Sequence, residues 1–510
     1  MTTTAQWTIF EASFDAPSSV HFTSPSGRLI PADSFWDGGD TWRVRFSPDE
    51  LGQWTWRASA AEGSFTCVPY QGDNPLYRHG VVGLSKDRRH FVHADETPFF
   101  WLADTAWNGV LKAQPADWDR YLDTRRLQEF TAVQFVCAQW RGCSQDPSGE
   151  VAFTYEPFAC HSERSEESRR SSLCINPVFF QRLDAKVAAI NAHGLLAAPV
   201  ILWALTEDDP GVYLALDDAI LVARYIVARY GAHQVAWLLG GDGHYAGQDA
   251  DRWRAIGQEL FGGRHDRLVT MHPCGLSWVA DEFRDQEWFD FIGYQSGHGD
   301  AESDLRWLTE GPPTQEWLKP PPRPIINLEP NYETHISYHS RHRFTDYEVR
   351  RAAYWSLLDA PTAGVTYGIN ATWCWHEKPE VPEAHEALGV VGPWSAGLES
   401  PGLCSMTFLR RFLDELPWFR LRPAPQLLAE QPGHADPELH IAAATTEDGD
   451  HAVFYLPGGD NLVLRDEALA RGRARWFNPA KGEWQEAAPD RYLRATFIAP
   501  DRDDWLLHIS

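Results

Sequence analysis

The sequence predicts an α/β protein: a (β/α)₈ barrel, the TIM-barrel architecture, flanked by an N-terminal and a C-terminal β-sandwich-like domain. Three observations support this prediction. Between about residues 90 and 400, short apolar runs alternate with helix-like segments, which indicates a parallel sheet covered by helices. Near both ends, short runs alternate apolar and polar residues between turns, which is typical of antiparallel sheets. A chain of 510 residues also has room for one large domain and two smaller ones.

The N-terminal domain is expected to occupy residues 1–75. Residues 41–46 and 53–57 alternate aromatic and polar side chains and are predicted as strands of an antiparallel β-sandwich. The pattern changes near Asn74-Pro75, so we place the domain boundary there.

The barrel is expected to occupy residues 76–410. Two of its helices have recognisable ends: Asn176 caps a helix that begins at Pro177 and stops at Gly194, and a capping box of Thr345 and Glu348 opens another. Apolar runs between turn residues predict eight strands, at residues 98–103, 132–138, 195–203, 235–239, 268–272, 289–295, 324–328 and 364–369.

Two further segments complete the organisation. Residues near 158–174 are charged and of low complexity, and such a stretch cannot bury enough apolar area to offset its ordering entropy. We therefore expect a flexible insertion in the loop after the second barrel strand. Residues 411–510 return to short strands, such as 451–456, which predicts a C-terminal β-sandwich.

The composition of the chain argues against several classes of binding partner. The formal net charge of −26 argues against nucleic acid, because a polyanion would be repelled. No apolar stretch approaches the roughly 18 residues that span a membrane, and the first residues lack the basic and apolar regions of a signal peptide, so we expect a cytoplasmic protein. The eight cysteines show no zinc-binding spacing, and no cofactor is expected. A small neutral carbohydrate is the expected partner, and the oligomeric state stays open.

Polar and aromatic side chains follow the predicted barrel strands, at the edge where barrel enzymes hold their chemistry. Carboxylates mixed with indoles, amides and imidazoles, almost without lysine, are typical of a site for a polyhydroxylated ring. The candidate catalytic residues are Asp242 and Glu329, and the candidate substrate-binding residues are Asp104, Trp107, Gln139, Trp203, His244, His272, Gln295, His298, Tyr332, Tyr367, Trp373 and Trp375.

Asp242 and Glu329 each follow or end an apolar run, at the fourth and seventh predicted strands. Glycoside hydrolysis needs one carboxyl group to protonate the leaving oxygen and a second to attack the anomeric carbon or activate water. A retaining enzyme would hold the two carboxyl groups about 5–5.5 Å apart, and an inverting enzyme about 6.5–9.5 Å. Structural alternatives stay open: Asp242 as a turn residue, Glu329 as a buried ion-pair partner, and Asp104 as a residue that holds the barrel rim together.

The histidines do not have the spacing of a metal site. His244, His272 and His298 fall on three separate loops, and the first predicted strand lacks the His-x-His pair of amidohydrolase barrels. We therefore expect them to be neutral donors to sugar hydroxyls, with no metal.

Several motifs occur in the order found in one known group. They include Trp42-Arg43-Val44-Arg45-Phe46, Trp101-Leu102-Ala103-Asp104, Trp237-Leu238-Leu239-Gly240-Gly241-Asp242, His272-Pro273-Cys274-Gly275, Gln295-Ser296-Gly297-His298 and Leu328-Glu329-Pro330. In these motifs the chain resembles the apiosidase-like glycoside hydrolases, similar to glycoside hydrolase family 140, which join an N-terminal β-sandwich, a (β/α)₈ catalytic barrel and a C-terminal β-domain.

The resemblance implies a retaining mechanism, with Asp242 as the acid/base and Glu329 as the nucleophile. The larger barrel clan has Asn-Glu at the fourth strand, whereas this sequence has Gly241-Asp242. Another group, such as His244, Gln295 or His272, must therefore contact the sugar 2-hydroxyl.

The sequence thus favours an exo-acting retaining glycosidase that releases a terminal sugar, apiose or a similar pentose or deoxyhexose. The alternative is a non-catalytic carbohydrate-binding protein built on the same barrel, because tryptophan is abundant and two β-domains flank the barrel.

Overall fold

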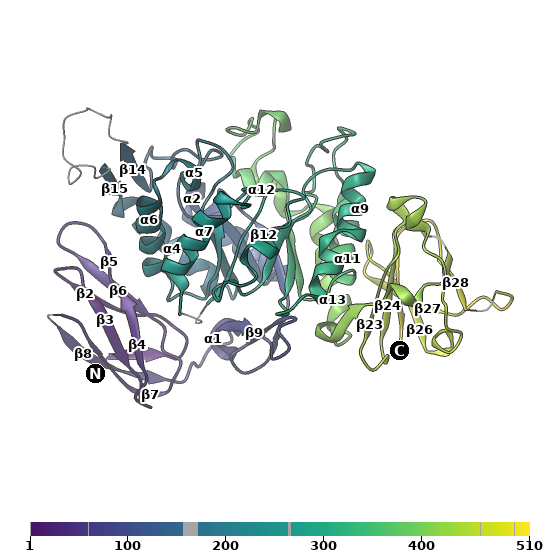
Figure 1. Cartoon of the computed structure of the whole chain (residues 1–510), viewed down its shortest axis with the longest axis horizontal. Coiled ribbons are helices and arrows are strands. Elements are labelled where there is room, and N and C mark those ends of the chain that lie inside the picture. Colours follow the sequence, from purple (N-terminus) through teal and green to yellow (C-terminus); the bar gives the residue numbers. More distant parts are fainter. Residues whose placement is uncertain (1, 60, 157–171, 264–266, 460, 494) are drawn as a thin grey trace.

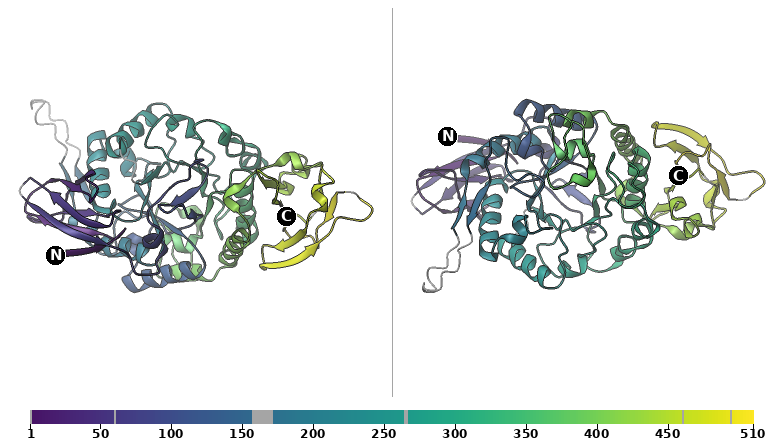
Figure 2. Two further views of the ribbon diagram at one scale, coloured as in Figure 1. Left: turned by 90° about the horizontal axis from the view of Figure 1, so that it is seen from below. Right: turned by 90° about the horizontal axis from the view of Figure 1, so that it is seen from above.

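In the computed structural model, residues 2–59, 61–156, 172–263, 267–459, 461–493 and 495–510 are described. The central part is an eight-stranded parallel barrel, and a β-domain lies on either side of it, so that the three parts form a row (Figure 1). Seen from below and from above, helices ring the strands and the β-domains stand on opposite sides (Figure 2). The predicted fold class is confirmed.

Each of the eight predicted apolar runs overlaps a barrel strand. The strands are β12 (Trp101–Thr105), β13 (Ala132–Val136), β16 (Leu196–Leu202), β17 (Ala236–Gly240), β18 (Leu268–Thr270), β19 (Ile292–Gln295), β20 (Ile325–Glu329) and β21 (Gly364–Tyr367). Neighbouring strands run parallel, as where Ala103 of β12 pairs with Ala132 of β13. Between β18 and β19 the Thr270 hydroxyl accepts a hydrogen bond from the Gly293 amide (2.9 Å) and donates to the Phe291 carbonyl (2.6 Å), which closes the ring.

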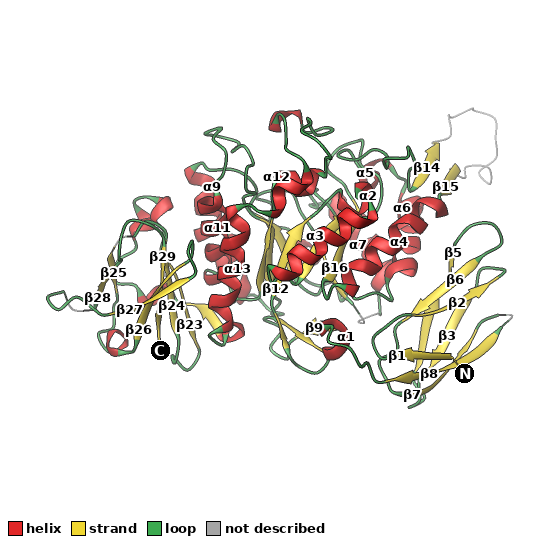
Figure 3. Ribbon diagram, turned by 180° about the vertical axis from the view of Figure 1, so that it is seen from behind, coloured by secondary structure: helices red, strands yellow, loops and turns green. Residues whose placement is uncertain are grey.

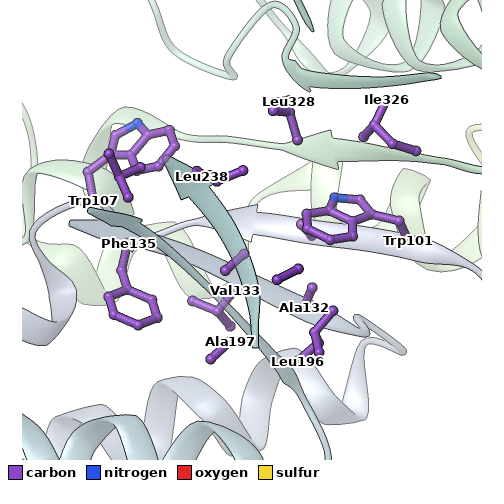
Figure 4. Packing of buried hydrophobic residues seen from close by; sticks show 14 of the residues in the cluster. Trp101, Trp107, Ala132, Val133, Phe135, Leu196, Ala197, Leu238, Ile326 and Leu328 are labelled. Atoms are coloured by element: carbon purple, nitrogen blue, oxygen red, sulfur yellow. The ribbon is translucent and has the colours of Figure 1, made fainter. Parts of the chain in front are cut away.

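Side chains from opposite strands fill the barrel, among them Trp101, Leu238 and Ile326 (Figure 4). A short polar chain runs through this core: the Thr366 hydroxyl donates to Gln134 Oε1 at 2.8 Å, and Gln134 Nε2 donates to the Leu328 carbonyl at 3.0 Å. Both faces of the strands are buried because helices cover the outside, which explains the nearly continuous apolar runs of the sequence.

Helices alternate with these strands and form the outer layer, whereas the two ends of the molecule are mostly strand (Figure 3). Asn176 accepts from the Val178 amide at the start of its helix, and Thr345 and Glu348 form the expected capping box, so both predicted helix starts are confirmed. The long helices are α3 (Pro115–Leu127), α4 (Pro177–Ala192), α6 (Leu216–Tyr230), α7 (Gln248–Phe261), α9 (Glu302–Glu310), α11 (Asp346–Leu358) and α13 (Pro401–Asp414). The short ones are α1 (Pro75–His79), α2 (Gly109–Lys112), α5 (Pro210–Tyr213), α8 (Ala280–Phe283), α10 (Pro312–Gln315) and α12 (Asn370–Cys374).

The predicted first strand divides in two. Residues 98 and 99 belong to a small antiparallel sheet, and only Trp101–Thr105 enters the barrel. The small sheet consists of β9 (Val82–Leu84), β10 (Phe91–His93) and β11 (Pro98–Phe99).

The N-terminal domain is a sandwich of two sheets around buried aromatic rings such as Phe22 and Trp54. One sheet has the strands β1 (Thr2–Ala5), β8 (Glu62–Val68), β7 (Gly52–Arg57), β3 (Ser19–Thr23) and β4 (Leu29–Asp33), and the other has β2 (Phe10–Phe14), β6 (Trp42–Phe46) and β5 (Phe35–Trp36). The guanidinium of Arg229 in α6 joins Asp37 of the sandwich (2.8 Å) to Asp184 of α4 (2.7 Å), so a buried ion network fixes the sandwich to the barrel.

The predicted flexible insertion lies mainly outside the described residues. Its flanks form a hairpin of β14 (Phe153–Glu156) and β15 (Ser172–Ile175). Residues 172–174, which were expected in the insertion, are therefore part of a strand.

The C-terminal domain is also all-β. Its main sheet has the strands β22 (Leu421–Pro423), β23 (Ala442–Thr446), β24 (Ala452–Leu456), β29 (Trp505–Ile509), β26 (Ala474–Asn478) and β27 (Glu483–Ala487), and β25 (Asn461–Val463) pairs with β28 (Thr496–Ile498). Arg350 of α11 binds both carboxylate oxygens of Asp504 at 2.8 Å, which anchors this domain to the barrel. Within the part of the chain that the structure describes, no helix has both the length and the apolar character needed to cross a membrane.

Candidate active site

The two candidate catalytic carboxylates lie together at the carboxyl ends of the barrel strands. Glu329 is the last residue of β20, and Asp242 follows β17 by two residues. Oxygen atoms of the two side chains lie within 4.8 Å of each other. Glu329 is buried, and the Asp242 side chain keeps 13% of its surface exposed, so a ligand can reach the pair from the Asp242 side.

His272 lies between the two carboxylates. Its Nδ1 is 3.4 Å from Asp242 Oδ1, and its Nε2 is 3.4 Å from Glu329 Oε2. The ring is fully buried; burial alone would lower the pKa of His272, but the two adjacent carboxylates outweigh it and raise that pKa. The sequence predicted this histidine for the site, and the structure gives it contact with both catalytic candidates.

His298 approaches Glu329 from the other side. Its Nε2 donates to Glu329 Oε1 at 3.0 Å, while its Nδ1 accepts from the Tyr332 backbone amide at 3.4 Å, which fixes the neutral tautomer. Burial lowers the pKa of His298 to about 3, so this imidazole is uncharged at neutral pH. Gln295 Nε2 lies 3.5 Å from Asp242 Oδ1 and completes the polar lining.

Opposing interactions determine the pKa of Glu329. Burial and the neighbouring Asp242 raise its pKa to about 7, whereas His272 and hydrogen bonds from Gln295 and Tyr332 act to lower that pKa. Both the protonated and the ionised form of Glu329 are therefore populated near neutrality. Double-displacement hydrolysis requires an ionised nucleophile beside a protonated acid.

Aromatic side chains form the walls around the carboxylates. The Trp107 indole donates to Tyr332 Oη at 3.1 Å, and its ring meets both Trp203 and His272 edge to face at 5.3 Å. Gly241 is required here, because a Cβ at this position would lie 2.4 Å from the Trp203 ring. The indole of Trp203 thus occupies the space that a longer side chain before Asp242 would need.

Arg141 belongs to the site and was not predicted from the sequence. Its guanidinium contacts Asp209 at 2.9 Å and lies 3.6 Å from Asp242 Oδ2, and it lies over the Trp203 ring. A signal existed, because Arg141 follows β13 within the motif Gln139-Trp140-Arg141. Asp209 gave no comparable signal, since it lies in the loop after β16, beyond the end of the strand.

Three more residues of the rim, which the sequence did not predict, are Tyr338, His335 and His385. Tyr338 is 59% exposed, and its ring packs edge-on to His298 at 5.8 Å and to His335 at 5.6 Å. His385 reaches the rim from the long loop after α12 and packs against Trp373 at 5.0 Å. Among the described residues no barrel strand ends next to His385, because α12 and a long loop separate it from β21, so the strand-end rule does not find it.

The predicted substrate-binding residues divide into three sets. The structure brings Trp107, Trp203, His272, Gln295, His298 and Tyr332 around the carboxylates. His244 and Trp373 lie at the rim, where His244 Nδ1 is 3.3 Å from the Cys274 thiol. The remaining four, Asp104, Gln139, Tyr367 and Trp375, make their contacts elsewhere.

Asp104 is fully buried and binds Arg125 (2.6 Å) and Tyr121 (2.7 Å) of α3, on the outside of the barrel. Tyr367 donates to Glu333 on that side as well. These two assignments are corrected: both residues point away from the barrel interior and support its outer layer.

Gln139 and Trp375 also make their contacts away from the two carboxylates. The Gln139 amide bonds the backbone of Ala152 and Phe153 and so holds the loop that leads into β14. The Trp375 ring stacks on Trp394 at 4.9 Å. Both stabilise loops behind the site.

Among the described residues, Asp242, His272 and Glu329 are the group of three whose ligand atoms are close enough to surround a cation. A bound cation would occupy the oxygen atoms that glycoside hydrolysis needs, and the imidazole already pairs with both carboxylates. We therefore assign no metal ligands among them.

A cavity of about 720 Å³ lies elsewhere, between the N-terminal sandwich and the amino ends of β17 and β18. Its lining includes Arg45, Trp237 and Leu268 and neither catalytic candidate. The chemistry is located at the other end of these strands.

Comparisons with known proteins agree with this architecture. The family model described as "Apiosidase-like, catalytic domain" matches residues 85–420. A domain of unknown function matches residues 3–61, and a model described as "Putative collagen-binding domain of a collagenase" matches residues 423–510. No curated protein is similar enough in sequence to be matched.

Two similar solved structures cover most of the chain. One, named a glycoside hydrolase, is 22% identical with a TM-score of 0.71 and covers 86% of this chain and 98% of its own. The other, a glycoside hydrolase family 5 protein from Bacteroides vulgatus, is 21% identical with a TM-score of 0.71 and covers 86% and 95%. At these identities the structures support the fold alone.

The apiosidase-like match extends over more than half of the chain and includes both Asp242 and Glu329. A non-catalytic binding protein, the alternative that the sequence left open, is therefore not adopted. The chain belongs to the apiosidase-like family and is a glycoside hydrolase.

Proposed function

We propose that this protein is a retaining, exo-acting glycosidase that releases a terminal apiose or a similar pentose or deoxyhexose. The observation that carries the proposal is the closeness of the two carboxylates, since one oxygen atom of Asp242 lies within 4.8 Å of one oxygen atom of Glu329. This closeness supports direct attack by one carboxylate, because retaining enzymes hold their carboxyl groups about 5–5.5 Å apart, whereas inverting enzymes hold them about 6.5–9.5 Å apart to admit water.

The surroundings of the two carboxylates support different roles. Glu329 accepts a hydrogen bond from the neutral His298, which orients its oxygen for attack and favours the ionised form against the burial and the Asp242 charge that raise its pKa to about 7. Asp242 is the more exposed of the two and lies nearer the opening, where a leaving group departs. We therefore assign Glu329 as nucleophile and Asp242 as general acid and base.

The shape of the rim supports exo action. The loops after β13 and after α12 meet where the Ser144 amide donates to Glu383 Oε2 at 3.3 Å, and His385 packs against Trp140 and Trp373 beside them. A wall at this end of the opening favours binding of a chain end over binding along a polymer.

The 2-hydroxyl of the sugar needs a donor other than the asparagine of the larger clan, because Trp203 fills the space beside Gly241. Gln295 is our candidate: its amide lies 3.5 Å from Asp242 and also contacts Glu329. A contact to this hydroxyl strengthens in the transition state.

A panel of aryl apiosides, arabinosides, rhamnosides and galactosides, with product configuration followed by NMR, tests the proposal. We expect turnover of one pentoside or deoxyhexoside with retained configuration. Initial release of the inverted anomer would overturn the retaining mechanism, and cleavage only within long oligosaccharides would overturn exo action.

A further inference from the structure

His272 has an unusual position for a substrate-binding histidine. Both ring nitrogens are buried, and each points at a different catalytic carboxylate, at 3.4 Å in both cases. Neither nitrogen has a closer polar partner among the described residues. The ring therefore faces the two reacting carboxylates and no other polar group.

The surrounding structure holds the ring in place. The His272 backbone amide donates to the Gly240 carbonyl at 3.0 Å, and the rings of Trp107 and Trp203 pack against the imidazole at 5.3 and 5.9 Å. Its backbone is tied to β17 and its ring packs against two indoles, so the imidazole is held between the two carboxylates.

The reaction proposed above moves a negative charge between the two carboxylates. In the first step a Glu329 oxygen bonds to the anomeric carbon, the glycosidic bond breaks, and the Asp242 proton passes to the leaving oxygen, so the charge moves from Glu329 to Asp242. In the second step Asp242 takes a proton from water, the water oxygen bonds to the anomeric carbon, and the bond to Glu329 breaks. The charge then returns to Glu329.

We propose that His272 is a positioning residue that acts as a doubly protonated imidazolium, donating from Nδ1 to Asp242 and from Nε2 to Glu329 and stabilising the charge on each in turn. This inference rests on the proposed retaining mechanism. His272 keeps both of its protons throughout the two steps, so no tautomer change is needed when the charge moves. A neutral imidazole has only one N–H and could donate to only one of the two carboxylates.

Other charged and titratable groups near the ring leave this role to His272. Arg141 lies near Asp242 Oδ2, on the loop after β13, and does not contact Glu329. His298 contacts Glu329 Oε1 and not Asp242. Tyr332 has a pKa raised well above its usual value by burial and by Glu329, so its phenol stays neutral. His272 is thus the cationic candidate placed between the two carboxylates.

The inference predicts a specific change in pH dependence. A cation beside a carboxylate lowers that carboxyl's pKa by about 1–3 units. The acid limb of a step is the part of its pH profile in which the rate falls as the pH is lowered; Glu329 sets this limb for the first step, and Asp242 in the glycosyl-enzyme sets it for the second. In His272→Gln both acid limbs should move to higher pH by about one unit or more. The matched variant His298→Gln replaces one neutral donor to Glu329 by another, so it removes no positive charge and should leave both acid limbs nearly in place.

The experiment is rapid-mixing kinetics with an aryl glycoside, measured across pH 4–9 for wild-type protein, His272→Gln and His298→Gln. The initial burst of released aryl group reports the rate of the first step, and the steady phase reports the rate of the second. Movement of both acid limbs in His272→Gln supports the inference. Movement of one limb, or of neither, overturns it while leaving the glycosidase proposal intact. If wild-type protein turns over no glycoside, the proposed function itself fails.

A second measurement reads the protonation state of the wild-type ring directly and does not depend on the activity of a variant. In wild-type protein labelled with ¹⁵N-histidine, the His272 ring should show two protonated nitrogens near pH 6, identified as the signals lost in His272→Gln or, if that variant does not fold, in His272→Asn. One protonated and one bare nitrogen would overturn the inference.

Discussion

Replacing Glu329 by glutamine should stabilise the protein at high pH. Burial beside Asp242 raises the pKa of Glu329 from 4.5 to about 7 in the folded state. For an acid whose folded pKa is raised, the favourable contribution is complete below the unfolded pKa and is lost as pH rises through about 7. At pH 8 the folded wild-type protein must therefore carry an ionised, buried carboxylate that the variant lacks.

The size of this effect follows from the shift. A rise in the pKa of Glu329 from 4.5 to about 7 corresponds to about 3 kcal/mol in the free energy of unfolding. For a barrel of this size that amounts to roughly 4 °C in melting temperature. The gain should be present at pH 8 and nearly absent at pH 5.

Thermal unfolding of wild-type and Glu329→Gln at both pH values measures the effect. Glu333→Gln is the matched control: Glu333 is also buried, but its carboxylate accepts bonds from Tyr367, Ser400 and the Gly402 amide, so this change should lower the melting temperature at both pH values. A Glu329→Gln protein no more stable than wild type at pH 8, or equally stabilised at pH 5, would refute the reasoning.

Three other substitutions test the site and its support. Asp242→Ala should reduce the turnover of substrates with poor leaving groups at least 10²-fold. Substrates with activated aryl leaving groups should lose much less turnover, because these leaving groups need little protonation. Equal losses on the two kinds of substrate would contradict the role of Asp242 as acid. Gly241→Ala should cost about 1–3 kcal/mol in stability, measured by denaturant unfolding, because its Cβ meets the Trp203 ring at 2.4 Å; unchanged stability would contradict that contact. Asp104→Ala should lower the free energy of unfolding by about 3–5 kcal/mol, because it leaves the guanidinium of Arg125 buried without its partner. The KM of the folded protein should stay unchanged, and a raised KM would indicate that Asp104 contacts the substrate.

The strands, and the place of Asp242 and Glu329 at the ends of two of them, could be predicted because they depend on local pattern. Strands buried on both faces have nearly continuous apolar sequences, and the residue at the carboxyl end of such a strand faces the barrel mouth. Glu329 and Asp242 follow that rule directly.

The errors at Asp104 and Tyr367 arise from the side that each residue faces. Successive residues of a strand point to opposite sides. Trp101 and Thr366 meet inside the barrel, where the indole donates to the hydroxyl at 3.2 Å, so Asp104 and Tyr367, which are out of phase with them, point to the helices. Because every residue of both strands is buried, no polarity difference along the sequence reveals this phase.

The remaining site residues depend on long-range packing. His385 comes from a loop that follows the last barrel strand at a distance, and it reaches the rim only because Trp140 and Trp373 receive its ring. His272 was placed in the site from the sequence, but its position between two carboxylates depends on three separate strands closing into one barrel.

The central claim is that Glu329 forms a covalent bond to the sugar. The fluorine atom of a 2-fluoro glycoside slows both steps, whereas a good leaving group makes the first step fast again. The glycosyl-enzyme should therefore accumulate. Mass spectrometry of the digested protein should then find one sugar on the peptide that carries Glu329. A sugar attached to Asp242, or no adduct on an enzyme that the reagent inactivates, would contradict the account.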